Sequence, residues 1–216
     1  VYVRVRNGEF YEELGELSTQ ELQAYFDRLK ITFAEGKDEG RAEVNLQAVE
    51  AIKSIGHKLS RGLVLTFDYG YPADELFTPK RIAGGGTLMC YNRHKAHANP
   101  YIHVGEQDIT THVDFSSLAL AGMEVNMNTV GFTDQHHALV GLGIANELVP
   151  LMNTKETNSP GGIRRNLAIK TLLLPGGLGG TLKVLVQEKG IGVSVAEKLS
   201  ALRSSLYNTK DLLQGK

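Results

Sequence analysis

The spacing of apolar residues alternates between the two-residue repeat of strands and the longer repeat of helices. Residues 1–17 alternate on both sides of Asn7-Gly8, which is the strongest short signal for a β-hairpin. Residues 45–60 keep an apolar stripe at helical spacing and predict a helix. The continuous apolar run 63–67 follows and predicts a buried strand that ends at Asp68. Such a run after a helix favours a parallel sheet covered on both faces.

The same repeats continue through the rest of the chain. Helices and strands alternate, which predicts an α/β fold. Helices are expected over 18–30, over 115–124, from Thr133 to about Met152 and over 163–174. Strands are expected over 87–91, 125–132 and 181–187. Residues 92–114 are polar and rich in histidine.

Composition narrows the possible functions. The 216 residues include 23 Lys and Arg and 24 Asp and Glu, so the net charge of −1 argues against nucleic acid as the main partner. No apolar run approaches the roughly 18 residues of a membrane span, and residues 1–20 lack the apolar core of a signal peptide. A single cysteine excludes a disulfide framework and a cysteine-based zinc site. The first residue is Val and already lies in a strand pattern, which favours a piece of a longer protein.

Two sets of polar residues are candidates for a site. Asp68 stands at the end of the predicted inner strand, where open α/β sheets bind ligands. Six of the seven histidines fall between 94 and 137, but their spacing matches no metal motif, so no metal is predicted. In the stretch 104–115, the polar side chains either brace a loop, with Asp114 capping the next helix, or face a ligand.

Other catalytic signatures fail on context. The glycines of 141–146 lie within a helical pattern instead of after a strand, and those of 176–183 precede a strand where a phosphate-binding loop precedes a helix. There is no Gly-x-Ser-x-Gly motif, and the single cysteine lies in an apolar strand pattern.

Three segments carry a family resemblance: Asp68-Tyr69-Gly70, residues 105–115 and residues 131–137. In this order they resemble the MidA family of S-adenosylmethionine-dependent methyltransferases, over about residues 1–190. The resemblance implies a Rossmann-like class I methyltransferase fold, with a mostly parallel sheet, one reversed strand and inserted helices. It also implies S-adenosyl-L-methionine as cofactor. The mitochondrial members methylate protein arginines and are needed to assemble respiratory complex I.

The resemblance also implies a domain organisation. The chain corresponds to the C-terminal part of a single methyltransferase domain, with the hairpin at 1–17, the sheet core at about 41–132 and 181–188, and a helical insertion at about 133–174. The N-terminal half of the family, with its Glu-x-Gly-x-Gly cofactor loop, has no counterpart in this sequence. We therefore expect this chain alone not to bind the cofactor tightly and to be inactive by itself.

The resemblance assigns roles to individual residues. Asp68, Tyr69 and Glu43 are the catalytic candidates, with Asp68 orienting an arginine guanidinium, and Gly70 is the cofactor-binding candidate. The substrate-binding candidates are His94, Asp108, Thr110, His112, Gln135 and His136.

The expected partner is a protein substrate, without nucleic acid or a membrane span. The expected location is the cytoplasm for a bacterial protein and the mitochondrial matrix for a eukaryotic one. Two alternatives stay open: a non-catalytic binding or assembly module of the same fold, and a metal-dependent hydrolase that uses the histidines.

Overall fold

The computed structural model describes residues 1–33, 40–144, 146, 159–174, 177–196, 198–205, 207, 209 and 212. The chain forms two compact units. Unit 1 comprises Val1–Leu46 and Asp74–His112, and unit 2 comprises Gln47–Ala73 and Val113–Lys216. The expected hairpin lies in unit 1, the expected helical insertion lies in unit 2, and the expected sheet core is divided between them.

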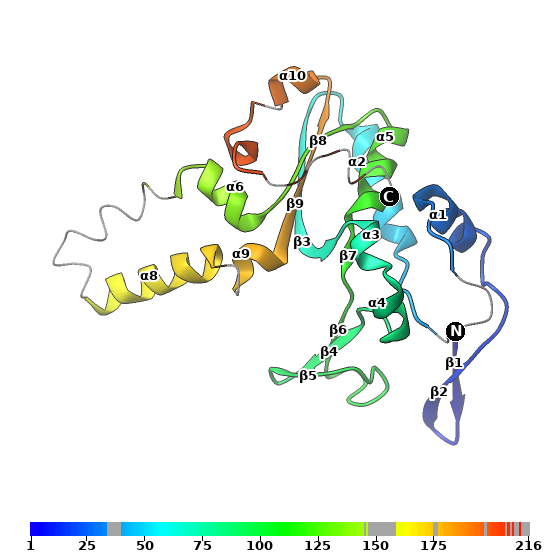
Figure 1. Cartoon of the computed structure of the whole chain (residues 1–216). Coiled ribbons are helices and arrows are strands. Elements are labelled where there is room, and N and C mark those ends of the chain that lie inside the picture. Colours follow the sequence, from blue (N-terminus) through cyan, green and yellow to red (C-terminus); the bar gives the residue numbers. More distant parts are fainter. Residues whose placement is uncertain are drawn as a thin grey trace. The chain divides into compact units, whose positions relative to one another are not determined.

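Unit 1 begins with the predicted hairpin. Strands β1 (Tyr2–Arg6) and β2 (Glu9–Glu13) pair in antiparallel fashion (Figure 1). The turn between them places Asn7 and Gly8 at φ 54° and 82°, the left-handed region that this dipeptide tolerates best. Helix α1 (Glu21–Leu29) follows inside the predicted range.

An ion pair fastens the hairpin within unit 1. Arg41 contacts the Glu12 carboxylate, and the Tyr101 hydroxyl donates a hydrogen bond of 2.8 Å to its other oxygen. The hydrogen bonds from Arg41 and then Tyr101 lower the pKa of Glu12 below its usual value, because they stabilise the charged carboxylate.

The strand predicted over 87–91 is present as β4 (Met89–Asn92), and the histidine-rich stretch after it contains two short strands, β5 (Lys95–His97) and β6 (Asp108–Thr110), that the sequence pattern did not predict. These strands form a three-stranded sheet in the order β5-β4-β6, with both pairings antiparallel. β5 and β6 have three residues each, too few to show a repeat. Cys90 of β4 is fully buried. The short helices α3 (Ala73–Leu76) and α4 (Pro79–Ala83) precede this sheet in the chain.

Unit 2 is built on a four-stranded sheet in the order β7-β3-β9-β8 (Figure 1). Its strands are β3 (Gly62–Tyr71), β7 (Val113–Asp114), β8 (Asn128–Asp134) and β9 (Leu182–Lys189). The family resemblance implied a mostly parallel sheet with one reversed strand. Here β9 is the reversed strand, antiparallel to both β3 and β8, and β3 and β7 are parallel, so these four strands do not show a mostly parallel sheet. Because β9 opposes both of its neighbours, β3 and β8 run in the same direction.

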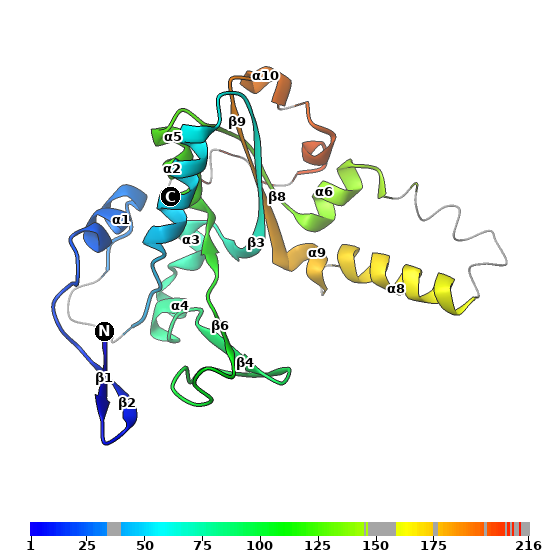
Figure 2. The ribbon, with the colours of Figure 1, turned by 180° about the vertical axis from the view of Figure 1, so that it is seen from behind.

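Helices cover both faces of this sheet. Helix α5 (Phe115–Glu124) packs on one face, where the buried Gln187 side chain donates to its Leu118 carbonyl. Helix α2 (Leu46–Lys58) lies beside α5, with Gly56 against Val125 (Figure 2). On the other face, Val184 and Val186 form a core with Ala138 and the segment around Leu202. This alternation along β9 explains why residues 183–188 are all buried.

Two predicted boundaries in unit 2 were wrong. Asp68 lies inside β3, because pairing with β9 continues to Tyr69 opposite Leu182. Thr133 lies inside β8, so helix α6 (Gln135–Gly141) begins after Asp134, which caps it through a bond from the His137 backbone N–H. The predicted continuation of this helix to Met152 falls on residues outside the described part.

The remaining helices are short except for one. α8 (Pro160–Leu173) matches the predicted helix, and α9 (Leu178–Thr181), α10 (Val193–Ala196) and the 3₁₀ turn η2 (Ser200–Leu202) follow along the chain. Within the described ranges, no helix combines the length and the apolar character needed to cross a bilayer.

Candidate functional site

The residues chosen from the sequence divide between the two units. Asp68, Tyr69, Gly70, Gln135 and His136 belong to unit 2. Glu43, His94, Asp108, Thr110 and His112 belong to unit 1.

Asp68 and Tyr69 present their side chains to solvent near the carboxyl end of β3. The Asp68 Oδ1 accepts a hydrogen bond of 2.7 Å from the neighbouring Tyr69 N–H. The Asp68 carboxylate is exposed and forms no ion pair among the described side chains, so it is accessible to a cationic group. Tyr69 is 42% exposed and belongs to an apolar row on β3 with Leu65 (50%) and Phe67 (52%).

Gly70 is buried where β3 meets β7. A Cβ on Gly70 would clash with the Val113 carbonyl oxygen and would lie 2.9 Å from the Phe115 ring. The close approach of these two backbones therefore requires glycine at this position.

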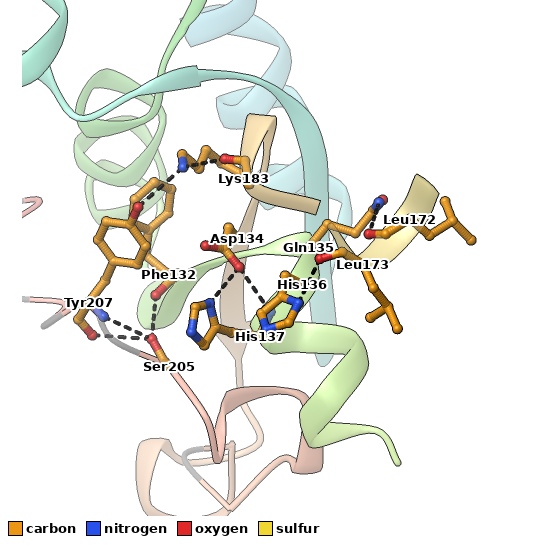
Figure 3. Close-up of polar contacts among 11 residues, drawn as sticks. Phe132, Asp134, Gln135, His136, His137, Leu172, Leu173, Lys183, Ser205 and Tyr207 are labelled. Atoms are coloured by element: carbon orange, nitrogen blue, oxygen red, sulfur yellow. Dashed lines mark hydrogen bonds and ion pairs between the residues drawn. The ribbon is translucent and has the colours of Figure 1, made fainter. Parts of the chain in front are cut away.

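A second group of polar residues lies at the same end of the sheet, on β8 and β9 (Figure 3). Lys183 of β9 is the cross-strand partner of Asp68 on one side and of Asp134 on the other. Directly opposed residues of an antiparallel pair share a face of the sheet. Asp68, Lys183 and Asp134 therefore form one row across three strands, at the carboxyl ends of β3 and β8.

The Lys183 ammonium is buried, with 6% of the residue exposed, and is held by neutral groups. It donates to the Gly180 carbonyl at 2.8 Å and to the Tyr207 hydroxyl at 3.2 Å. The rings of Tyr71 and Tyr207 lie 5.9 and 5.4 Å from its nitrogen, within the range of cation–π attraction. No carboxylate pairs with it among the described residues.

Tyr207 reaches this group from the C-terminal segment. Its ring packs on Phe132 at a centroid distance of 5.1 Å, and the Ser205 hydroxyl donates to the Phe132 carbonyl at 2.8 Å (Figure 3). These contacts fix the C-terminal segment against β8 and place a phenol beside the buried ammonium.

Asp134 and His137 form a pair of titratable groups at the end of β8. The His137 Nδ1 lies 2.6 Å from the Asp134 Oδ1, which also accepts the His137 backbone N–H at 2.9 Å (Figure 3). An ionised carboxylate only accepts hydrogen bonds, so beside ionised Asp134 the ring donates from Nδ1, and a neutral ring then has its lone pair on Nε2. The carboxylate thus fixes both the orientation and the tautomer of the ring.

Gln135 and His136 face the end of helix α8. Gln135 donates to the Leu172 carbonyl at 3.2 Å, and the His136 Nδ1 lies 2.8 Å from the Leu173 carbonyl oxygen. Both side chains satisfy the last carbonyls of α8, which have no partner within their own helix. Their polar atoms therefore join α6 to α8.

Glu43 organises the glycine-rich loop of unit 1. Its Oε2 accepts bonds from the Thr87 N–H (2.9 Å) and hydroxyl (3.0 Å), and that hydroxyl accepts the His112 N–H at 3.0 Å. Gly86 has φ +81° and packs so closely on the carboxylate that a Cβ would clash with it. Glu43 therefore lies near the start of α2 and also joins two segments that are 44 residues apart in the sequence.

The other candidates of unit 1 lie on the small sheet. His94 is exposed in the β4–β5 turn, where Arg93 and His94 have φ of 48° and 64°. Asp108 and Thr110 are exposed on β6, and the Thr110 hydroxyl donates to the Met89 carbonyl at 3.2 Å. The described residues contain no group of three or more His, Cys, Asp or Glu side chains that could hold a metal ion.

The sequence did not lead us to select Asp134, His137, Lys183 or Tyr207 as candidate site residues. A charged residue inside the apolar run 182–186 was a usable signal for Lys183, and the spacing of Asp134 and His137 was a weaker one. No local pattern indicated Tyr207, which arrives through the fold of the C-terminal segment. The arrangement offers a free carboxylate, a buried cation and an oriented imidazole at one end of a sheet.

The chain matches one family of proteins. The family model described as "Putative S-adenosyl-L-methionine-dependent methyltransferase" matches residues 1–133. No curated protein matches the chain.

Two similar solved structures come from Burkholderia thailandensis. One is the native crystal structure of an uncharacterized COG1565 superfamily protein, with 26% identity and a TM-score of 0.76, covering 94% of this chain and 51% of that chain. The other is a COG1565 superfamily member bound to S-adenosyl-homocysteine, with 28% identity and a TM-score of 0.78, covering 94% of this chain and 49% of that chain. The chain thus spans about half the length of these two proteins.

Proposed function

Because the chain belongs to the S-adenosyl-L-methionine-dependent methyltransferase family, whose model matches residues 1–133, we propose that it contributes the acceptor side of a methyl-transfer enzyme. The main support is the likeness, at 28% identity, to a protein bound to S-adenosyl-homocysteine, the product that remains after the methyl group has left. The order β3-β9-β8 with a reversed β9 agrees with the single reversed strand of the class I methyltransferase fold.

A further part of the fold, which holds the cofactor, lies beside β3 in this proposal. β3 pairs with β7 only at Gly70 and Tyr71, so the rest of that edge has no strand partner among the described residues. The apolar row Leu65, Phe67 and Tyr69 on β3 is 42–52% exposed, although apolar rows of inner strands are normally covered. The similar proteins are about twice as long, which is enough chain to supply those strands.

The test is a calorimetric titration of S-adenosyl-homocysteine into two proteins. One is this chain, and the other is a chimera that joins it to the half of the Burkholderia thailandensis protein that it does not match. We expect micromolar binding to the chimera and none to the chain. A folded chimera that does not bind contradicts the proposed function, whereas binding by the chain alone contradicts the division between two halves.

The proposed acceptor is a protein arginine. Asp68 supports this choice, because an exposed carboxylate without an ion-pair partner can take a guanidinium in a two-point contact. In the chimera, Asp68→Asn should lower methylation of arginine peptides about 10²-fold or more, since positioning of the acceptor supplies much of the rate. Equal labelling of lysine and arginine peptides would contradict the arginine assignment.

The link to respiratory complex I assembly rests on the family resemblance. Its test is co-purification of the tagged protein with complex I subunits from its own cells. The alternative, a binding or assembly module without catalysis, is favoured by the exposed apolar row on β3, because such a row can also bind a partner. A chimera that binds S-adenosyl-homocysteine without transferring methyl groups would select this alternative.

A further inference from the structure

We infer that Asp134 and His137 form a proton-accepting pair, in which the His137 Nε2 takes up the proton that the methyl acceptor loses. This inference rests on the proposed function and narrows its substrate class. Its basis is the 2.6 Å contact between the His137 Nδ1 and the Asp134 Oδ1, with both side chains mostly buried at 21% and 13% exposure. A carboxylate on one ring nitrogen, with the other nitrogen as base, is the arrangement by which Asp orients His in hydrolase triads.

Two basic side chains near Asp134, those of Lys183 and His136, form their hydrogen bonds with other groups. Lys183 is the cross-strand neighbour of Asp134, yet its ammonium turns to the Gly180 carbonyl and the Tyr207 hydroxyl. His137 is the ion-pair partner of Asp134 among the described residues. His136, whose ring lies 4.9 Å from that of His137, is bonded to the Leu173 carbonyl. The negative charge is therefore available to stabilise an imidazolium on His137.

The position of the pair fits a role in catalysis. Asp134 is the last residue of β8, and its register partner Lys183 also faces Asp68 on β3. β3 and β8 run in the same direction, so the pair and Asp68 lie at the same edge of the sheet. Ligands of open α/β sheets bind at the carboxyl ends of the strands.

The chemistry restricts the acceptor. When bound, S-adenosylmethionine supplies the methyl group, and the electrons of the broken carbon–sulfur bond stay on the sulfur of the thioether product. The acceptor nitrogen or oxygen forms its new bond to the methyl carbon with a lone pair, and its N–H or O–H proton passes to the His137 Nε2 and then to water. A base is needed only where the nucleophile carries a proton, so the substrate class is a group with an N–H, O–H or S–H, such as a guanidine, amine, hydroxyl or thiol, and a thioether is excluded.

The first experiment needs no activity. Histidine ring ¹⁵N–¹H correlation spectra of this chain, which has seven histidines, report the tautomer of each ring. We expect His137 to hold its proton on Nδ1 in the wild type and to lose that preference in Asp134→Ser, because serine retains a helix cap but removes the carboxylate. If the serine variant does not fold, Asp134→Asn replaces it, and we expect a weaker preference of His137 for a proton on Nδ1. The exposed His57 is the internal reference. A proton on Nε2 in the wild type, or an unchanged tautomer without the carboxylate, overturns the pair.

The second experiment measures catalysis in the chimera. His137→Gln should lower kcat by about 10²–10⁴-fold and leave the affinity for S-adenosyl-homocysteine unchanged. Added imidazole should restore part of the activity of His137→Ala, which a purely structural histidine would not show. Unchanged kcat, or loss without rescue, overturns the catalytic role. If the wild-type chimera transfers no methyl group, the proposed function fails, and the tautomer measurement still decides whether the pair exists.

Discussion

Replacing Gly70 with alanine tests whether this glycine serves the packing of β3 or the binding of a cofactor. The added Cβ would clash with the Val113 carbonyl oxygen, and it would lie 2.9 Å from both the Val113 carbonyl carbon and the Phe115 Cε2. Carbon atoms in contact sit about 3.5–4.0 Å apart. β7 must therefore move away by at least about half an ångström.

The expected loss of stability comes from the hydrogen bonds between β3 and β7 that the movement of β7 disrupts. β3 and β7 pair at two positions, Gly70 with Val113 and Tyr71 with Asp114. Each hydrogen bond in such a pairing contributes about 1 kcal/mol net, and overpacking of a close contact costs about 1–3 kcal/mol. We expect Gly70→Ala to lower the free energy of unfolding of unit 2 by about 2–4 kcal/mol.

The assay is urea unfolding followed by circular dichroism, with Gly161→Ala as the matched control. Gly161 lies in the first turn of α8, where a Cβ meets only the Ser159 Oγ at 3.9 Å. The same substitution there should be neutral or stabilising by up to about 1 kcal/mol. A Gly70→Ala protein within about 0.5 kcal/mol of the wild type would refute the packing argument. Weakened binding of S-adenosyl-homocysteine to the chimera, at unchanged stability, would instead support the cofactor role.

Three further predictions concern single contacts. Asp114→Ala should destabilise the protein by about 1–2 kcal/mol in urea unfolding, because the carboxylate accepts hydrogen bonds from the Ser116 and Ser117 N–H groups in the first turn of α5; Asp114→Asn should cost only a few tenths. The hydrogen bond from Asn128 lowers the pKa of Glu188 below its usual value of 4.5. Ionised Glu188 therefore stabilises the folded protein above about pH 4.5, and this contribution is lost as the pH falls through the lowered pKa. Glu188→Gln should make the stability depend less steeply on pH in this acid range, and an equally steep dependence would contradict the argument. Thr87→Val removes a hydroxyl bonded to Glu43 and should cost about 1–3 kcal/mol, whereas Thr87→Ser should retain most of the stability measured by thermal melting.

The elements that local chemistry defines were predictable from the sequence. The Asn7-Gly8 turn was identified because its residues favour positive φ, and helix α5 has the predicted bounds, 115–124, because Asp114 caps it. These features depend on neighbours within a few residues, so the pattern of the sequence contains them.

The predicted boundaries failed where distant strands decide them. Asp68 and Thr133 are each kept inside a strand by pairing with β9, which is more than forty residues away in the sequence. The place of the reversed strand depends on the same distant pairing, because β9 lies between β3 and β8 and no local pattern indicates this order.

The candidate site was predictable only in part. Asp68 lies near the carboxyl end of β3, three residues before the strand ends, but its register with Lys183 depends on pairing between strands. The Asp134–His137 contact requires Asp134 to cap the helix, one residue after the cap that the sequence pattern predicted at Thr133.

The buried Cys90 allows the stability of the small sheet of unit 1 to be measured separately from that of unit 2. It is the single cysteine of the chain, it has no exposed surface, and it sits on the middle strand of the β5-β4-β6 sheet. A thiol reagent can reach it only when that sheet opens, so the labelling rate under native conditions gives the opening free energy of this sheet. The protein thus contains a built-in reporter that follows one unit while circular dichroism follows both.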